Sequence, residues 1–327
     1  MASKSALLKL PEAAVPLLRC PECRESLATS AEGLACTQCK REYAVEGGVA
    51  ILFDEQTSLY SRGSVSRSRA KQASTPKVKG RIEKLLPDLE RNFVARDHAE
   101  SFARRLLAEN PAPMILNIGG KHAGAACLKL RNDPAARVVE MDVRPGPLAN
   151  LLADPSQIPF ADGTFDAVII DAVLEHVAEP IAVADEIWRV LKPRGMVYSD
   201  VPFMLQVHGG SLDFWRFSHV GHRCLFRKFE ELESGMSQGP SVALECAILY
   251  FWLSFVRGRY ARYAVRSMCR LTLFPLKYLD YLLVRKPGAM DAVMGTFFIG
   301  RRSEHDIPQR TLLDAYRGAS PDLHPVR

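Results

Sequence analysis

Four cysteines near the start of the chain have the spacing of a metal site. Cys20 and Cys23 form one CxxC pair, and Cys36 and Cys39 form a second pair after 12 intervening residues. Each pair lets two thiolates converge from one tight turn, and two such turns complete the tetrahedral sulfur shell that Zn²⁺ prefers. Because all four ligands are cysteines, no position is left open for water, so we expect a structural ion. Free or redox-active thiols are the alternative, although a redox CxxC usually opens a helix of a larger thioredoxin-like unit.

A second group of reactive side chains falls between residues 202 and 219. His208, Asp213, Trp215 and Arg216 supply a base, two opposite charges and a flat apolar ring within one short stretch. An acceptor site needs these three kinds of group. We therefore predict that His208 acts as a base and that Asp213 and Arg216 orient an acceptor. The alternative is a structural ion pair between Asp213 and Arg216 that holds the loop, with Trp215 in the core.

Glycine and acidic residues follow segments with the composition of buried strands. The apolar run at 114–118 leads into Gly119 and Gly120, and the run at 138–142 ends in Asp142. A strand, a glycine turn and a helix let the backbone approach a ligand closely, and an acid at the end of the next strand suits ribose hydroxyls. A simple strand-end cap is the alternative role for Asp142.

Alternating strands and helices form the frame for these residues. Apolar runs predict strands at 114–118, 138–142, 165–170, 196–201 and 293–300. A helix is predicted from Pro180 to the break at 192–195, and one or two amphipathic helices are predicted over 82–109. This order predicts an α/β fold with a doubly wound sheet, whose ligand lies at the carboxyl ends of the strands.

Residues 114–203 resemble the class I S-adenosylmethionine-dependent methyltransferases, in particular those with a type 11-like domain. The resemblance is carried by Asp-x-x-x-x-Pro-Phe at 154–160, Phe-Asp-x-Val at 165–168, Leu-Glu-His-Val at 174–177 and Leu-Lys-Pro-x-Gly at 191–195. It implies a Rossmann-like, seven-stranded methyltransferase sheet, S-adenosylmethionine as the cofactor and an enzyme that transfers a methyl group. An NAD-linked Rossmann enzyme is the nearest rival, but its GxGxxG motif is absent from the sequence.

The resemblance also assigns cofactor contacts in this chain. Gly119 would lie under the methionine part, Asp142 would hold the ribose hydroxyls and Asp154 would face the adenine amino group. Simpler roles are a turn former for Asp154 and a backbone-satisfied turn residue for His176. The full predicted set is Asn117, Gly119, Gly120, Asp142, Asp154, Asp171, Ala172 and His176.

The first glycine loop departs from the pattern of that family. The family's loop usually reads acid-x-Gly-x-Gly-x-Gly, whereas this chain has Asn117 in place of the acid, and Lys121 and Ala123 in place of two glycines. Lys121 could clash with the cofactor or pair with its carboxylate. The departure motivates a rival hypothesis, a non-catalytic scaffold of methyltransferase fold that binds a partner through its zinc ribbon.

Residues 17–53 resemble the small zinc-ribbon proteins that activate tRNA, rRNA and release-factor methyltransferases. The shared features are the Leu-Leu-Arg-Cys-Pro-Glu-Cys opening at 17–23 and the Tyr-x-Val-x-Gly-Gly-Val-x-x-Leu close at 43–52. Those proteins mask apolar surface on the enzymes that they bind. The resemblance implies a fused structural or recruiting module.

A basic, apolar insert is predicted before the last strand, at about 240–287. Its apolar stretches at 242–256 and 271–284 are separated by five arginines, and between Arg257 and Lys286 there are eight Lys/Arg and one acid. A spanning helix needs about 20 apolar residues, which neither stretch has. Basic residues between apolar faces suit a helical hairpin on an anionic membrane surface or over a lipid-like acceptor. A plain buried helical cap over the acceptor pocket is the alternative.

These observations predict four regions in the 327-residue chain. They are a zinc-ribbon domain at 1–55, a basic polar linker at 56–80, a methyltransferase domain at 81–303 and a polar tail at 304–327. Because the start of the sequence lacks a secretory pattern, we expect a cytoplasmic protein, peripheral at the inner face of the membrane if the insert binds lipid. The linker could serve as a nucleic-acid tail, but its aromatic residues are sparse, so we do not favour that partner.

The leading hypothesis is an S-adenosylmethionine-dependent methyltransferase with an unidentified acceptor. The insert favours a small, lipidic or glycan-linked molecule over a macromolecule. An RNA or protein acceptor rests only on the analogy with the zinc-ribbon proteins.

Overall fold

The computed structural model describes residues 7–31, 33–54, 56, 58–60, 63, 93–119, 125–314 and 316–319, and every structural statement below concerns these residues. Most of the predicted linker lies outside them. So do Gly120 and Lys121 of the first glycine loop.

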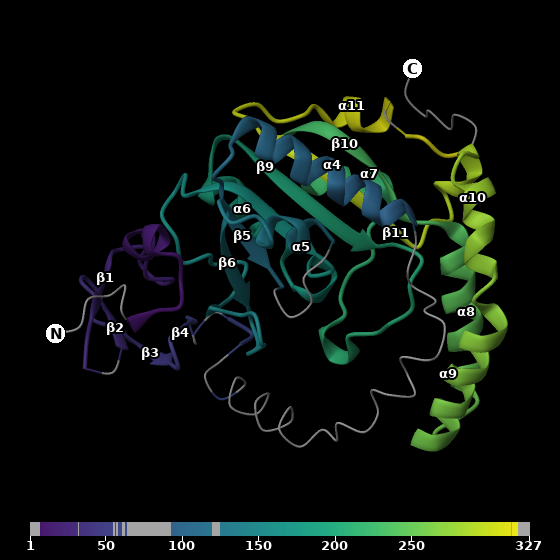
Figure 1. Ribbon diagram of the computed structural model, residues 1–327, viewed down its shortest axis with the longest axis horizontal. Coiled ribbons are helices and arrows are strands. Elements are labelled where there is room, and N and C mark those ends of the chain that lie inside the picture. The colour runs from purple at the N-terminus through teal and green to yellow at the C-terminus, as the bar shows by residue number, and fades with distance from the viewer. Residues whose placement is uncertain are drawn as a thin grey trace.

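One mixed sheet of 11 strands runs through the protein, in the order β1-β2-β3-β4-β7-β6-β5-β8-β9-β11-β10 (Figure 1). Its centre consists of the parallel strands β7 (Leu151–Ala153), β6 (Arg137–Asp142), β5 (Met114–Ile118), β8 (Phe165–Asp171) and β9 (Leu191–Pro202). β11 (Gly295–Arg302) lies antiparallel between β9 and β10 (Phe229–Gln238). The seven strands from β7 to β10 confirm the predicted sheet.

Helices cover both faces of this sheet, which makes it doubly wound. On one face, Ile115 of β5 packs with Phe102 of α4 (Phe93–Glu109) and with α5 (Ala125–Arg131). On the other, the neighbouring Leu116 packs with Ile187 of α6 (Pro180–Val190) and with Phe226 after α7 (His219–Leu225). Successive side chains of a strand point to opposite faces, so the unbroken apolar runs of the central strands are explained by burial on both sides.

The predicted break at 192–195 is part of a strand. α6 ends at Val190 and β9 begins at Leu191, five residues earlier than the expected start at 196. The register between β8 and β9 shifts between Phe165 and Ala167, and Arg194 has a φ of +64°. The proline and glycine therefore produce an irregular start of the strand instead of a separate loop.

The ribbon continues the sheet at its outer edge. β1 (Leu27–Thr29), β2 (Gly33–Cys36), β3 (Glu42–Glu46) and β4 (Val49–Leu52) pair as an antiparallel meander. β4 then pairs in parallel with β7. The 3-10 helix η1 (Glu12–Leu17) precedes the ribbon, and Ala161 N donates a hydrogen bond to Leu17 O at 2.9 Å. The ribbon and the parallel part of the sheet thus share backbone pairing and one apolar core.

The predicted helical insert lies between β10 and β11. It consists of α8 (Pro240–Ser254), α9 (Arg259–Leu273), η5 (Leu276–Leu279), α10 (Asp280–Leu283) and η6 (Pro287–Ala289). α8, α9 and α10 form a layer at one end of the molecule, beyond the edge of the sheet (Figure 1). None of the helices in the described residues combines the length and apolar character that crossing a bilayer requires. The chain continues from β11 to α11 (Gln309–Asp314), which contacts α7.

Candidate active site

A cavity of about 630 Å³ lies at the carboxyl edge of the parallel strands. Five of the predicted cofactor residues line it: Gly119, Asp142, Asp171, Ala172 and His176. Asp142 is 8% exposed at the end of β6, and its Oδ1 accepts a hydrogen bond from Arg144 N at 2.9 Å. The strand ends bring these residues together because all five follow β5, β6 or β8 at the same edge of the sheet.

Gly119 is required by the backbone at the end of β5. Its φ is +91°, and a β-carbon at this position would lie 2.4 Å from Val173 Cγ2. An L-residue would therefore be strained and would also clash with the loop after β8. The glycine lets two loops approach each other at the floor of the cavity.

Two predicted cofactor residues direct their side chains elsewhere, and one lies outside the described residues. Asn117 Nδ2 donates to Glu140 Oε2 at 2.6 Å, and both side chains are buried. Asp154 accepts from Ser58 Oγ at 2.5 Å and from Ser156 Oγ at 2.6 Å. Neither Asn117 nor Asp154 is among the residues that line the cavity. Gly120 is not described, so its role stays a prediction, as do those of Asn117 and Asp154.

Sequence reasoning missed several residues of the cavity wall. Tyr60, which falls in the predicted linker, is 9% exposed, packs its ring 6.3 Å from that of Phe53 and lines the cavity. Arg144 and Leu212 line it as well. Tyr60 is the only aromatic residue at 56–80, which was the available signal. Arg144 follows the predicted ribose ligand by two positions and could have been found from that spacing.

A second cavity of about 620 Å³ adjoins the first and shares Asp171, Ala172 and His208 with it. Its inner wall includes Glu175 and Asp200. The helical insert forms the outer wall, with apolar side chains from α8 and two arginines from α9: Cys246, Leu249, Tyr250, Leu253, Arg266 and Arg270. The insert therefore bounds a pocket next to the predicted cofactor site.

Two carboxyl groups stand side by side where the cavities meet. Asp171 and Asp200 are register partners at the ends of β8 and β9, and Asp200 Oδ1 accepts from Ser237 Oγ at 2.7 Å. Burial raises the pKa of Asp171 to about 6. Burial and the neighbouring Asp171 raise the pKa of Asp200 well above its ordinary value. The two carboxyl groups on the wall of the second cavity therefore lose their protons at a higher pH than ordinary aspartates do.

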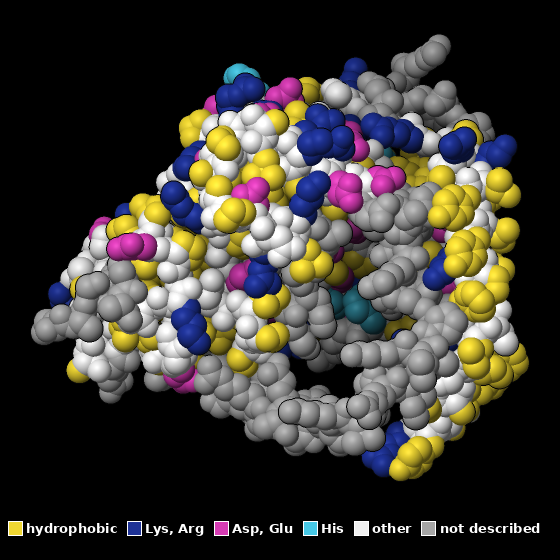
Figure 2. Space-filling view, viewed as in Figure 1, with side chains coloured by type: hydrophobic (Ala, Val, Ile, Leu, Met, Phe, Trp, Pro, Cys, Tyr) yellow, Lys and Arg dark blue, Asp and Glu magenta, His cyan; other side chains and the backbone are white. Residues whose placement is uncertain are grey.

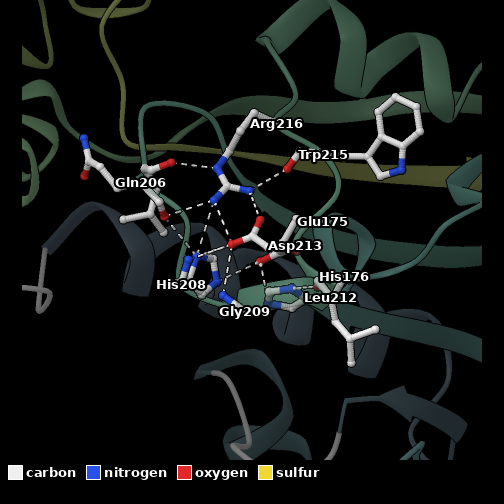
Figure 3. A network of polar contacts seen from close by, with 10 residues as sticks. Glu175, His176, Gln206, His208, Gly209, Leu212, Asp213, Trp215 and Arg216 are labelled. Carbon is white, nitrogen blue, oxygen red and sulfur yellow. Dashed lines mark hydrogen bonds and ion pairs between the residues drawn. The ribbon is translucent and has the colours of Figure 1, made fainter. Parts of the chain in front are cut away.

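Glu175, His176 and His208 form a compact group (Figure 3). Glu175 and His176 belong to the short 3-10 helix η3 (Leu174–His176), and His208 lies on the loop before η4 (Gly210–Leu212). Glu175 Oε1 lies 3.8 Å from His176 Nε2 and 3.8 Å from His208 Nε2. The predicted base His208 is therefore at the wall shared by both cavities.

Asp213 and Arg216 contact each other and the loop around them (Figure 3). Arg216 Nη2 donates to Asp213 Oδ2 at 3.1 Å, and Arg216 Nε donates to Leu205 O at 2.7 Å. Asp213 Oδ2 also accepts from His208 N at 2.7 Å. Neither charged side chain lines either cavity. This geometry is that of the structural ion pair, although Trp215 is 44% exposed and so is not in the core.

The four predicted metal ligands converge in the ribbon. The sulfur atoms of Cys20, Cys23, Cys36 and Cys39 all lie within 4.8 Å of one another. The Cys20 and Cys39 sulfurs are 3.7 Å apart, and those of Cys23 and Cys36 are 3.3 Å apart. Four thiolates at about 2.3 Å from a tetrahedral Zn²⁺ are about 3.8 Å from one another. The residues therefore fit a four-coordinate zinc ion.

Comparisons with known proteins agree with this fold. The family model described as a methyltransferase domain matches residues 116–199. A demethylmenaquinone methyltransferase from Clavibacter sepedonicus is 49% identical over 157 residues, which is 46% of this chain and 56% of that protein. The chain therefore spans little more than half the length of this curated relative.

Solved structures match at lower similarity. Haemonchus contortus phosphoethanolamine N-methyltransferase 2, bound to S-adenosyl-L-methionine, has a TM-score of 0.40 and 15% identity, and the match covers 64% of this chain and 53% of that one. The [4+2]-cyclase SpnF has a TM-score of 0.37 and 16% identity, with 62% of this chain and 80% of that one covered.

Proposed function

We propose, because the chain carries an S-adenosylmethionine-dependent methyltransferase domain, that the protein transfers the methyl group of this cofactor to a small amphiphilic acceptor. The observation that carries the proposal is the junction of the two cavities at Asp171, Ala172 and His208. Methyl transfer requires the acceptor atom about 3–3.5 Å from the methyl carbon, in line with the breaking bond. A wall shared by a cofactor cavity and an acceptor cavity supports such an alignment.

In the first cavity, the residues present fit S-adenosylmethionine. Gly119 allows the backbone to approach the ligand, and the Asp142 carboxylate lies where two ribose hydroxyls can donate to it. Bound cofactor supplies an electrophilic methyl group on a sulfonium. The chain's own part would be to hold the cofactor beside the residues that the two cavities share.

In the second cavity, the wall supports an acceptor with an apolar body and an anionic group. Leu249, Tyr250 and Leu253 offer apolar contact, and Arg266 and Arg270 bring two positive charges to the same space. A guanidinium binds carboxylates and phosphates through two parallel hydrogen bonds. The relative named as a demethylmenaquinone methyltransferase also supports a small-molecule acceptor.

The outer face of the insert supports contact with an anionic membrane, the source from which such an acceptor would come. Figure 2 shows apolar side chains gathered along the outer side of the insert. The large apolar residues that the insert exposes are Leu244, Phe251, Trp252, Phe255, Tyr260, Met268, Leu271, Tyr278, Leu279, Tyr281, Leu282 and Leu283. The one acid at 257–286, Asp280, is buried, whereas this segment has eight Lys/Arg. An exposed apolar face with only basic charge at its margins suits the surface of an anionic bilayer.

The Cys20, Cys23, Cys36 and Cys39 cluster would hold a structural Zn²⁺ in the ribbon. With four thiolate ligands the ion would have no open position, so its part would be to fix the two turns that carry the cysteines. Because β4 pairs with β7, the same ion would support the edge of the sheet next to the cofactor cavity.

Calorimetry with S-adenosylmethionine and its demethylated product tests the proposed activity. We expect micromolar binding by the wild-type protein and at least tenfold weaker binding by Asp142→Ala, since the ribose would lose a charged partner. Asp133→Ala, on the exposed turn after α5, should bind as wild type does. Absence of binding by the wild-type protein at millimolar ligand would refute the activity and leave the scaffold hypothesis.

Vesicle sedimentation tests membrane contact. The protein should pellet with vesicles containing about one third phosphatidylglycerol and stay in solution with pure phosphatidylcholine, because the margin of the insert is basic. The double variant F255S/L282S should lose binding, while L59S, a similar change of an exposed residue outside the insert, should keep it. Equal sedimentation by all three proteins would rule out docking through the insert.

A further inference from the structure

Three potential metal ligands converge at the junction of the cavities. They are Glu175 Oε1, His176 Nε2 and His208 Nε2, which all lie within 4.8 Å of one another, and Figure 3 shows the three side chains directed at one point. His176 comes from the wall of the cofactor cavity, Glu175 from the wall of the acceptor cavity, and His208 from both. Two imidazoles and one carboxylate around one point form a donor set that binds first-row transition metals.

The outer contacts of both histidines leave their Nε2 atoms able to bind a cation. His176 Nδ1 lies 2.7 Å from Leu212 O, and a carbonyl can only accept, so Nδ1 carries the proton and Nε2 keeps its lone pair. His208 Nδ1 lies 3.4 Å from Asp213 Oδ2 and 3.3 Å from Gln206 O, two acceptors that favour the same tautomer, while the Arg216 Nη2 donor lies farther away at 3.5 Å. Metal-binding histidines usually donate their other ring N–H to a carboxylate or a backbone carbonyl in this way.

Glu175 supplies the second, independent observation. Its side chain is 1% exposed, and neither carboxylate oxygen has a hydrogen-bond partner within the described part of the chain. Its backbone carbonyl is fixed by Phe214 N at 2.8 Å, so the residue is held in place at the site. A buried, unpaired carboxylate costs several kcal/mol unless it takes up a proton or a cation compensates it. His176 and His208, which face the Glu175 carboxylate, supply no compensating positive charge in their neutral forms.

We infer that Glu175, His176 and His208 bind one divalent transition-metal ion, of the Mn²⁺, Fe²⁺, Co²⁺ or Zn²⁺ class, at the junction of the two cavities. Ligand atoms about 2.1 Å from such an ion lie about 3.0–3.5 Å apart, so the 3.8 Å contacts must shorten by a few tenths of an ångström. Mg²⁺ and Ca²⁺ prefer all-oxygen sites and are not expected here. The side chains of His176 and His208 are 23% and 31% exposed, so the ion faces the cavities and has open positions.

The role of the ion in catalysis rests on the proposed function. An open position would take an oxygen of the acceptor, a hydroxyl or an enol, whose proton leaves more readily when the oxygen is bound to a cation. The proton passes to water or to the Asp171–Asp200 pair. The oxygen lone pair then forms the new bond to the methyl carbon, and the pair of the breaking carbon–sulfur bond returns to sulfur. In this arrangement His208 is a ligand, and the predicted base is not needed.

Titration with Mn²⁺, followed by the loss of the six-line electron paramagnetic resonance signal of the free ion, tests the site without an acceptor. The full-length protein is first loaded with one equivalent of zinc per chain, which the four-thiolate cluster takes up in preference to the junction, so that the junction stays open for Mn²⁺. We expect one further Mn²⁺ per chain. E175Q, H176N and H208N should each weaken Mn²⁺ binding at least tenfold, because one of three ligands is lost or uncharged. H305N, which changes an exposed histidine far from the site in sequence, should bind as wild type does.

Zinc content and calorimetric binding of the demethylated cofactor show whether each variant is folded. E175Q keeps the shape of the side chain and removes its charge, so it serves if a histidine variant fails to fold. Wild-type protein that binds the demethylated cofactor but no Mn²⁺, or variants that bind Mn²⁺ as wild type does, would overturn the metal site and leave the proposed function standing. Protein that binds Mn²⁺ but neither form of the cofactor would overturn the function and keep the site.

Discussion

Gly209 lies directly against the imidazole of His176: a β-carbon at this position would come within 2.5 Å of ring Cε1 and 2.6 Å of Nδ1. The loop that carries His208 is therefore packed on the neighbouring histidine with no space between them. Because Nδ1 is also bonded to Leu212 O, the ring has little freedom to move away without losing that contact.

Gly209→Ala should consequently displace His176 and weaken Mn²⁺ binding about tenfold or more, while zinc content stays the same. Gly258→Ala is a matched control, since nothing lies within 4 Å of a β-carbon there and the position is in the insert. Paramagnetic resonance titration of both variants provides the comparison. Equal Mn²⁺ affinity in G209A and wild type would contradict this packing argument.

Gly119→Ala should abolish binding of S-adenosylmethionine. The variant combines backbone strain at a φ of +91° with a contact of 2.4 Å to Val173 Cγ2. The double variant G119A/V173A removes the contact but not the strain, so calorimetry should show only partial recovery. Full recovery in the double variant would mean that the clash alone matters, and undiminished binding by G119A would exclude the loop from the cofactor site.

Arg216→Ala should lower the stability of the protein and not merely its affinity for an acceptor. The guanidinium donates to Asp213 and to the carbonyls of Leu205 and Gln206, and its side chain is 22% exposed. Removing one partner of a largely buried pair costs about 3 kcal/mol, whereas Arg227→Ala at an exposed pair should cost less than about 1 kcal/mol. Urea unfolding measures both. If R216A unfolds as wild type does, the ion pair does not stabilise the loop.

Removal of zinc should destabilise the whole chain and not only the ribbon. β4 pairs with β7, and residues of η1 and the ribbon share an apolar core with the central strands. A chelator, or Cys39→Ser, should lower the melting temperature by several degrees, because the free energy of metal binding contributes to folding. Cys224→Ser, at an exposed cysteine outside the cluster, should change neither zinc content nor melting temperature. An unchanged melting temperature after complete loss of zinc would separate the ribbon from the fold.

Stability should fall between pH 6.5 and pH 4 because three buried histidines are held neutral. Burial lowers the pKa of His98 to about 4, of His219 to about 4 and of His222 to about 3. The unfolded chain takes up these protons near pH 6.5 while the folded chain does not, so the contribution is complete above that pH and is lost as the pH falls. Each histidine should cost about 2 kcal/mol between pH 7 and pH 5.

His98→Phe is a matched variant for this effect. The ring of His98 stacks on Phe297 at 4.0 Å, so phenylalanine keeps the stacking and removes the titrating group. Urea unfolding of H98F should depend less steeply on pH than that of wild type. Because loss of zinc in acid affects both proteins alike, the difference isolates the histidine. Identical pH profiles would show that His98 is not held neutral.

The sheet and the cysteine cluster were predictable because their signals are local. The apolar run at 165–170 and the two CxxC pairs are local patterns that determine a strand and a pair of metal-binding turns. The structure contains the strand and the cluster of four cysteines. The helical insert was found from its apolar and basic stretches. The start of β9 was misplaced because Pro193 and Gly195 predict a break, whereas pairing with β8 overrides that local preference.

The site was predictable only in part because it depends on contacts between distant segments. Gly119, Asp142 and Asp171 follow strands and so fall at one edge by topology. Tyr60 lines the cavity from a segment far from the other lining residues in sequence, and the approach of His208 to Glu175 brings together residues that are 33 positions apart. The periodicity of apolar residues does not predict contacts between distant segments. For the same reason, the side-chain hydrogen bonds of Asn117 and Asp154 could not be predicted from the sequence.

The pairing of β4 with β7 has a consequence for how the ribbon is held. An unpaired outer strand would be open to pairing with another chain. Here that edge is covered by a segment of the same polypeptide, whose effective concentration at β7 is set by its covalent attachment to the chain and not by expression level. Because the pairing of β4 with β7 is intramolecular, it does not depend on protein concentration, and dilution does not separate the ribbon from the sheet.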